Sequence, residues 1–232
     1  MDSTLIYSFL KDLAGNNSLD WMEKNRAYYE QAKREWEQLI GELLAGIQTF
    51  DNSITILPPK EYMFKLNRDT RFSKDKSPYN SSFRAHISKT GRQPVPVGYY
   101  VCVKPKGTFL GGGLFVSMFS GATKSVRDYI VKNGNKLKII TEAPDFINNF
   151  VIDGEKLKNI PKEYDGGHEF AEYLKHKSWY LEYSIKDHDF LYRDKFVKTS
   201  VTVFKYMKPF NDFLNSALKN FEMPRRAAPG QL

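Results

Sequence analysis

Apolar side chains recur at three- and four-residue intervals near the start of the chain. Those between Ile6 and Leu13 predict a short amphipathic helix, and the Gly15-Asn16-Asn17 turn ends it. From Trp21 to Ile47 the same spacing continues along one face and predicts a second, longer helix. Two N-terminal helices therefore pair as a hairpin about the Gly-Asn turn.

From residue 53 the pattern changes to short stretches in which bulky apolar and polar side chains alternate. These stretches predict strands at 53–57, 62–66, 82–88, 98–104 and 108–117. The prolines at 58 and 59 stop the first strand, and Pro105-Lys106-Gly107 joins the last two. Short turns between neighbouring strands favour antiparallel pairing.

Helical spacing dominates the second half of the chain. The pattern predicts helices at 123–132, 135–142 and 169–175, and strands at 150–152 and 178–185. The stretch from Val197 to Leu218 starts with β-branched residues but keeps helical spacing, so we predict a helix broken or kinked at Pro209. A run of strands followed by a run of helices is typical of the α+β class. We expect a central, mostly antiparallel sheet with an N-terminal helical hairpin and C-terminal helices packed on it.

Composition fits one core-forming domain. Hydrophobic residues make up 41% of the 232 residues and aromatic residues 15%, far from the polar composition of disordered chains. No internal repeat and no linker interrupts the pattern. We predict a single α+β domain at 1–222 and a flexible C-terminal tail at 223–232, where core residues are absent.

Cysteine and charge bear on the compartment. Cys102 is the one cysteine, so no internal disulfide forms. The N-terminus has an acidic residue, Asp2, and no basic segment followed by an apolar block, and no apolar run approaches the roughly 20 residues of a membrane helix. We expect a cytoplasmic protein with no membrane partner.

The familiar cofactor and metal motifs do not fit this chain. The Gly111-Gly112-Gly113 run lacks the third glycine of the dinucleotide fingerprint, and 121–125 lacks the glycine that precedes lysine in a P-loop. The histidines are scattered, without an HExxH pattern or a cysteine pair. We expect neither a cofactor nor a metal site.

The segment 68–79 is dense in charge. Arginine forks match phosphate and carboxylate oxygens two at a time, and a loop between strands can present several cations to one ligand. The candidate ligand-binding residues are those of this loop and two on the next strand: Arg68, Asp69, Arg71, Lys74, Lys76, Arg84 and His86. The alternative is a solvated loop in which Asp69 pairs with Arg71 or Arg84, and for His86 a packed core position. The sequence leaves these alternatives open.

Three blocks carry a resemblance to a known family. They are Phe9 to Leu13 with Asn16-Asn17 and Trp21 to Arg26, then Arg68 to Tyr79, and last Gly98-Tyr99-Tyr100 followed by 109–114. In their order and spacing the chain resembles, over roughly residues 5 to 220, the bacterial "domain of unknown function 2461" family. The resemblance implies a single α+β domain whose central antiparallel sheet is flanked by helices. It implies no activity and no catalytic residue.

Three functions follow from the residues. We favour a binding protein for a small anionic or phosphorylated ligand, held by the basic loop 68–79. An enzyme of unknown reaction is the second, with Asp69 and His86 as acid–base candidates in the same pocket. The third is a nucleic-acid or protein interaction module that uses the surface of a chain with net charge +8. Nucleic acid is not favoured, because the charge is not concentrated in one long run, and the sequence assigns no oligomeric state.

Overall fold

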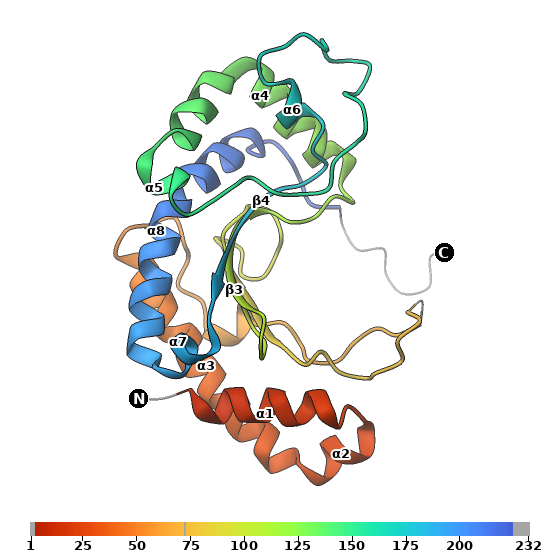
Figure 1. The fold of residues 1–232 in the computed structure, drawn as a ribbon, viewed down its shortest axis with the longest axis vertical. Coiled ribbons are helices and arrows are strands. Elements are labelled where there is room, and N and C mark those ends of the chain that lie inside the picture. Colours follow the sequence, from red (N-terminus) through yellow and green to blue (C-terminus); the bar gives the residue numbers. More distant parts are fainter. Residues whose placement is uncertain (1–2, 72, 225–232) are drawn as a thin grey trace.

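The computed structural model describes residues 3–71 and 73–224. These residues form an α+β fold of helices packed on a four-stranded antiparallel sheet, as the sequence predicts (Figure 1). The helices are α1 (Thr4–Gly15), α2 (Leu19–Lys24), α3 (Arg26–Gln48), α4 (Ser120–Thr141), α5 (Pro144–Ile147), α6 (Ala171–Leu174), α7 (Asp187–Leu191) and α8 (Arg193–Ala217), with a 3-10 turn, η1 (Pro59–Glu61). The strands are β1 (Phe83–Ile87), β2 (Tyr99–Val103), β3 (Thr108–Leu114) and β4 (Trp179–Ile185).

The four strands lie in the sheet in chain order, each antiparallel to the next. The strands predicted at 82–88, 98–104, 108–117 and 178–185 are therefore confirmed, with slightly shorter bounds. The register places Tyr100 opposite Gly111, and Gly111 opposite Glu182. Residues that lie opposite one another on neighbouring strands point to the same face of the sheet, so Tyr100, Gly111 and Glu182 share one face.

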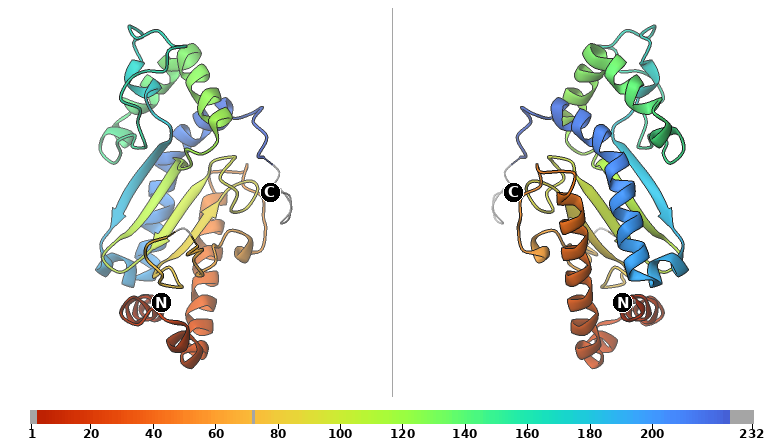
Figure 2. Two further views of the ribbon diagram at one scale, coloured as in Figure 1. Left: turned by 90° about the vertical axis from the view of Figure 1, so that its right-hand side faces the viewer. Right: turned by 90° about the vertical axis from the view of Figure 1, so that its left-hand side faces the viewer.

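One face of the sheet is packed against α3 and α8 (Figure 2). Phe83 of β1 stacks on Trp36 of α3 with ring centroids 5.8 Å apart, and Tyr99 of β2 meets Phe204 of α8 at 5.2 Å. All four of these side chains are buried. The hydrophobic core therefore lies between this face and the two long helices, and the opposite face is left to loops.

The N-terminal hairpin differs from the prediction in one detail. The long second helix is divided into α2 and α3 at Asn25, whose backbone angles (φ −108°, ψ 23°) are not helical. The Asn25 amide donates to the Trp21 carbonyl oxygen at 2.9 Å, so its side chain supports the break. Ser18 caps α2 by accepting from the Trp21 backbone N–H.

The strands predicted at 53–57, 62–66 and 150–152 are wrong. Two prolines that follow residue 57 remove backbone donors, and the chain forms η1 there instead of a ladder. Met63 makes only an isolated bridge to Ala85, so the segment 62–64 lies along the free edge of β1 without becoming a strand. At 150–152 the chain is irregular, and an isolated bridge joins the next residue, Asp153, to Tyr180.

The helical second half is more continuous than predicted. The helices expected at 123–132 and 135–142 are one element, α4, with a non-helical residue at Asn133 between them. The helix predicted at 197–218 is confirmed within α8, and of the predicted break or kink at Pro209 the break is wrong, because α8 continues through it. Phe204, Met207 and Phe210 on either side are fully buried, and this packing outweighs the one backbone hydrogen bond that proline removes.

The buried apolar cluster draws on residues from Ile6 to Leu218. Of the tail predicted at 223–232, Met223 is described and packs against this cluster, and 225–232 lie outside the described residues. A single domain at 1–222 stays a prediction. Within 3–71 and 73–224, no helix is both long enough and apolar enough to cross a membrane.

Candidate functional site

The predicted basic loop, 68–79, is fixed at its base. The Arg68 N–H donates to the Pro78 carbonyl oxygen at 2.9 Å, and Asn67 bridges Tyr79. The side-chain amide of Asn17, in the turn between α1 and α2, donates to the Tyr79 carbonyl oxygen at 2.8 Å and accepts from the Tyr79 backbone N–H at 3.1 Å. The loop projects from the side of the sheet that faces away from α8 (Figure 1).

Two of the loop cations are matched by the loop's own carboxylates. Arg71 binds Asp69 through Nε and Nη2, the latter at 2.7 Å, and Arg68 pairs with Asp75. The Arg71 guanidinium lowers the pKa of Asp69 to about 2. Hydrogen bonds from Ser77, and then Arg68, hold the pKa of Asp75 far below its ordinary value. These contacts are the internal pairing that the alternative interpretation requires, and the exposed pairs contribute little to stability.

The two lysines of the loop, Lys74 and Lys76, have fewer contacts with the loop than the arginines have. Lys76 donates to the Thr70 carbonyl oxygen at 2.9 Å, and Lys74 is exposed. Neither forms an ion pair with a carboxylate among the described residues. The loop thus keeps cationic side chains for a ligand, and its role in binding stays a prediction.

Arg84 and His86 point to the same face of β1, the one that α3 and α8 leave uncovered. The Arg84 guanidinium lies 5.5 Å from the centre of the Phe64 ring, its Nε is buried without a hydrogen-bond partner, and no described carboxylate pairs with it. His86 is 5% exposed, and burial lowers its pKa to about 4. A neutral, packed His86 is what the structural alternative predicts, and Asp69 is bound to Arg71 rather than to this imidazole.

A groove of about 380 Å³ opens at the edge of β1, between α3 and the segment 60–67. Its cationic lining residues are Lys33, Lys60, Lys65 and Arg92, and no carboxylate lines it. The remaining lining is aromatic or apolar, apart from one amide: Tyr29, Met63, Phe64, Leu66, Asn67 and Phe83. We call this cavity the basic groove.

Most of the basic groove's charge is uncompensated. Lys60 and Lys65 form no ion pair among the described residues, and Arg92 reaches only the Glu61 backbone oxygen, at 3.5 Å. Lys33 has Glu30 at 3.8 Å on the same helix and lies 5.8 Å from the Tyr29 ring centre. The sequence did not reveal this site because its cations come from α3, from 60–65 and from 92, and they form no cluster of basic residues along the chain.

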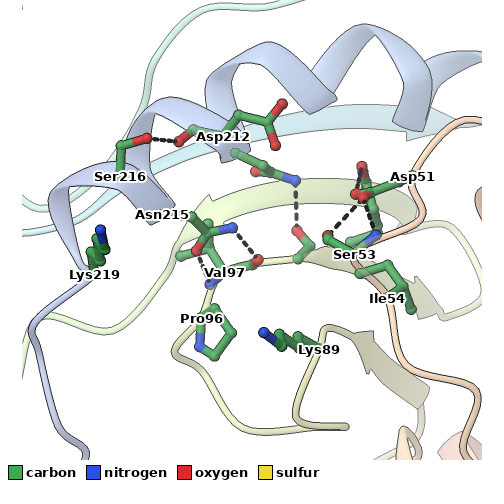
Figure 3. Close-up of a pocket in the computed structure, with 13 residues that line it drawn as sticks. Asp51, Ser53, Ile54, Lys89, Pro96, Val97, Asp212, Asn215, Ser216 and Lys219 are labelled. Atoms are coloured by element: carbon green, nitrogen blue, oxygen red, sulfur yellow. Dashed lines mark hydrogen bonds between the residues drawn. The ribbon is translucent and has the colours of Figure 1, made fainter.

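A second cavity, of about 420 Å³, lies between α8 and the segment 88–98 (Figure 3). Asn215 binds both backbone groups of Val97, at 2.8 and 3.0 Å, and Asn211 donates to the Gly98 carbonyl oxygen at 3.0 Å, while the Asn211 Oδ1 is buried without a hydrogen-bond partner. The buried Asp51 carboxylate accepts from the Tyr99 hydroxyl at 2.7 Å. These contacts hold the end of the 88–98 segment against α8.

No group of three or more histidine, cysteine or acidic side chains is placed to hold a metal ion in the part of the chain that the structure describes. Cys102 is buried on β2, and its burial raises the pKa of the thiol. A protonated, enclosed thiol is a poor nucleophile.

Comparison with known proteins adds a family. No curated protein and no solved structure matches the chain. A family model described as "Conserved hypothetical protein (DUF2461)" matches residues 6–213, which span every strand and all the lining residues of the basic groove. The chain therefore belongs to the DUF2461 family.

Proposed function

We propose that this protein binds a small anionic ligand, and that the basic groove is where the anion sits. One observation carries the proposal: four cationic side chains, and no carboxylate, surround a cavity of about 380 Å³. Cavities of a few hundred cubic ångströms are the usual size for small ligands. Like charges around one cavity repel one another, so an anion that enters relieves the repulsion and gains attraction from each cation.

The lining also indicates the shape of the ligand. Tyr29 and Phe64 supply aromatic walls, while Met63 and Leu66 supply apolar surface. A ligand with a phosphate or carboxylate and an attached apolar or planar part would use both. Arg92 suits a phosphate or carboxylate because its planar fork can donate two parallel hydrogen bonds.

The predicted loop 68–79 can complete the site. Asn67 lines the groove and also bridges Tyr79 at the base of the loop, so the two features are joined. In this proposal Lys74 and Lys76 extend the positive potential around the groove, while Arg68 and Arg71 need their carboxylate partners displaced before they contact ligand.

A thermal-shift experiment tests the proposal. The panel holds inorganic phosphate, sugar phosphates, nucleoside monophosphates and dicarboxylates, each at low and moderate salt. A ligand at a hundred times its dissociation constant stabilises the fold by about 2.7 kcal/mol, which is a readable shift. We expect one compound class to stand out against the others.

Matched charge variants locate the effect. Lys60→Gln/Lys65→Gln removes two groove cations, and Lys198→Gln/Lys205→Gln removes two exposed cations from α8. We expect the first pair to abolish the shift and the second to preserve it. Equal losses in both pairs would mean that net charge, not the groove, attracts the anion. A third variant, Arg68→Gln/Arg71→Gln, shows whether the loop takes part.

A further inference from the structure

The face of the sheet opposite α3 and α8 carries a different chemistry from the basic groove. We call it the open face, since neither of the two long helices reaches it (Figure 1). His86 and Cys102 of this face are buried. The larger side chains that reach solvent come from alternate positions on the strands and from the residue after β3: Arg84, Tyr100, Phe109, Phe115, Tyr180 and Glu182. All except Glu182, which is exposed, are half-buried.

The aromatic rings of the open face form one continuous array. Tyr100 stacks on Phe109 at 5.8 Å and meets Phe115 at 5.3 Å, and Phe115 stacks on Tyr180 at 4.5 Å between ring centroids. Phe64, on the segment along the free edge of β1, extends the array to 6.1 Å from Tyr100. The array crosses the sheet from β1 to β4, about 14 Å at ordinary strand spacing.

A glycine makes room for one ring of the array. Gly111 sits between Tyr100 and Glu182 in the register and has no side chain to occupy that row. The Phe115 ring fills the space, and a Cβ on Gly111 would lie only 2.6 Å from a ring carbon. Rings of this kind could have packed under a helix, as those of the opposite face do. A contiguous, half-exposed aromatic surface instead marks an interaction site.

The charged side chains of the open face indicate which kind of ligand it binds. Arg84 lies at the β1 end of the array with no described carboxylate to pair with, and its Nε is buried without a partner. The loop 68–79, with Lys74 and Lys76, projects on the same side of the sheet (Figure 1). The β4 end is acidic: Glu182 stands there, and Asp153 and Glu155 lie near Tyr180. These carboxylates repel phosphate but can accept hydrogen bonds from the amino groups of bases. The cation at the β1 end suits a phosphate group, and the acceptors at the β4 end suit the amino groups of bases.

We propose that the open face binds single-stranded nucleic acid, with unpaired bases stacked on Tyr100, Phe115 and Tyr180 and a phosphate held by Arg84. A four-stranded antiparallel sheet with aromatic residues on its uncovered face presents two or three bases with stacking partners at once. Every base has a flat face, so stacking of this kind tolerates many sequences. A duplex hides those faces and cannot use the array.

This inference does not rest on the proposed function. The basic groove shares Phe64 with the edge of the array, but its four cations, Lys33, Lys60, Lys65 and Arg92, are not side chains of the open face, and its ligand is a small anion. Loss of one site therefore leaves the other testable.

Fluorescence anisotropy with labelled oligonucleotides of about twelve nucleotides tests the proposal, since stacking platforms cover about 4–16 nucleotides. The arms are single-stranded RNA, single-stranded DNA and the duplex of the same sequence, between about 50 and 200 mM salt. We expect single strands to bind at least tenfold more tightly than the duplex. Equal affinity for duplex and single strands would overturn the proposal, and so would no binding to any oligonucleotide.

Tyr100→Leu and Tyr180→Leu test the rings, with Tyr192→Leu as the matched control. Tyr192 is 65% exposed and lies before α8, away from the array. Leucine keeps apolar bulk while removing the stacking face, and thermal unfolding shows whether each variant is folded. We expect each array variant to weaken single-strand binding by roughly tenfold, within the range known for base–aromatic stacking. Unchanged affinity in the two folded array variants would sink the stacking role.

Photocrosslinking fixes the position. An oligonucleotide that carries 5-iodouracil is irradiated with the protein, and the crosslinked peptides are identified by mass spectrometry. The proposal requires crosslinks on peptides that contain Tyr100, Phe115 or Tyr180. Crosslinks confined to other peptides would overturn it, as would equally tight binding of a free nucleoside monophosphate, which would mark a small-ligand site instead.

Discussion

Two arginines show how differently this protein treats charge on the two sides of its sheet. Arg193, at the start of α8, is 1% exposed and lies between Glu35 at 2.8 Å and Glu42 at 2.9 Å on α3. Arg84, on the open face, has an aromatic ring as its neighbour and no described carboxylate. The helix-packed side satisfies its buried cation internally, whereas the open side leaves one unmatched.

The rings follow the same division. On the helix-packed side Trp36, Phe83 and Tyr99 are buried between the sheet and the helices. On the open face Tyr100 and Tyr180 stay half-buried, with no helix over them. The comparison teaches that composition alone does not separate core from site: tyrosine, phenylalanine and arginine occur on both faces, and the helices decide which of them meet solvent.

The largest effect we expect comes from the glycines of β3. Gly113 has a φ of +103°, and a Cβ there would collide with the backbone oxygen of Trp179 on β4. Gly113→Ala therefore combines backbone strain with a clash that only the sheet itself can relieve, and we expect a loss of about 4 kcal/mol in the free energy of unfolding. Urea denaturation measures it.

Gly111→Ala is the matched control on the same strand. Its new methyl group meets the Phe115 ring, which can swing toward solvent, and Gly111 has no positive φ. The loss should be much smaller than for Gly113→Ala, about 1 kcal/mol. Equal losses at the two positions would show that the open face is as rigid as the helix-packed side.

Variants of Arg193 and Arg84 compare the contribution of a paired and an unpaired arginine to stability. Arg193→Met leaves Glu35 and Glu42 without their cation, and we expect the free energy of unfolding to fall by about 3 kcal/mol. The two glutamates are partly exposed, so water limits the loss. Arg84→Met removes a cation that has no described carboxylate partner, and with it the contacts to the Phe64 ring and the Tyr100 hydroxyl, so the loss should be about 1 kcal/mol. A large loss at Arg84 would mean that it serves the fold rather than a ligand.

The strands with strong alternation, such as β2 and β4, were predictable because their side chains face two different environments. The segment 62–66 also alternates, yet it forms no strand, since only Met63 bridges β1. The groove cations were not predictable: Lys33 and Arg92 are far apart in sequence and meet only through the fold. In the predicted loop, Arg71 and Asp69 are two residues apart, and that spacing supported both a ligand site and the internal pair.

The buried imidazole of His86, at the β1 edge of the open face, makes the free energy of unfolding depend on pH. Burial lowers its pKa from an unfolded value of 6.5 to about 4, so the unfolded chain takes up the proton first as the pH falls. The stability is complete above pH 6.5 and is lost as the pH falls toward 4. Between pH 7 and 5 the loss due to His86 is about 2 kcal/mol.

Denaturation curves across that pH range measure the slope. His86→Gln should flatten it, and His188→Gln, at an exposed position of α7, is the matched control. Burial also lowers the pKa of His176, which adds to the slope in every variant, so the difference between variants is the quantity to compare. A slope that persists in His86→Gln would mean that this imidazole is already charged in the folded protein.

The smallest effect on stability is expected in the basic loop. Asp69→Asn breaks the fork with Arg71, but both side chains are exposed, and exposed ion pairs contribute little because water replaces the lost contact. The unfolding curve should not move measurably. The variant removes the Asp69 carboxylate that competes with an anion for Arg71, so any thermal shift by phosphate compounds should grow if the loop contributes to the basic groove. An unchanged shift in Asp69→Asn, together with its loss in Lys60→Gln/Lys65→Gln, would assign the anion to the groove alone and leave the loop as a self-paired turn.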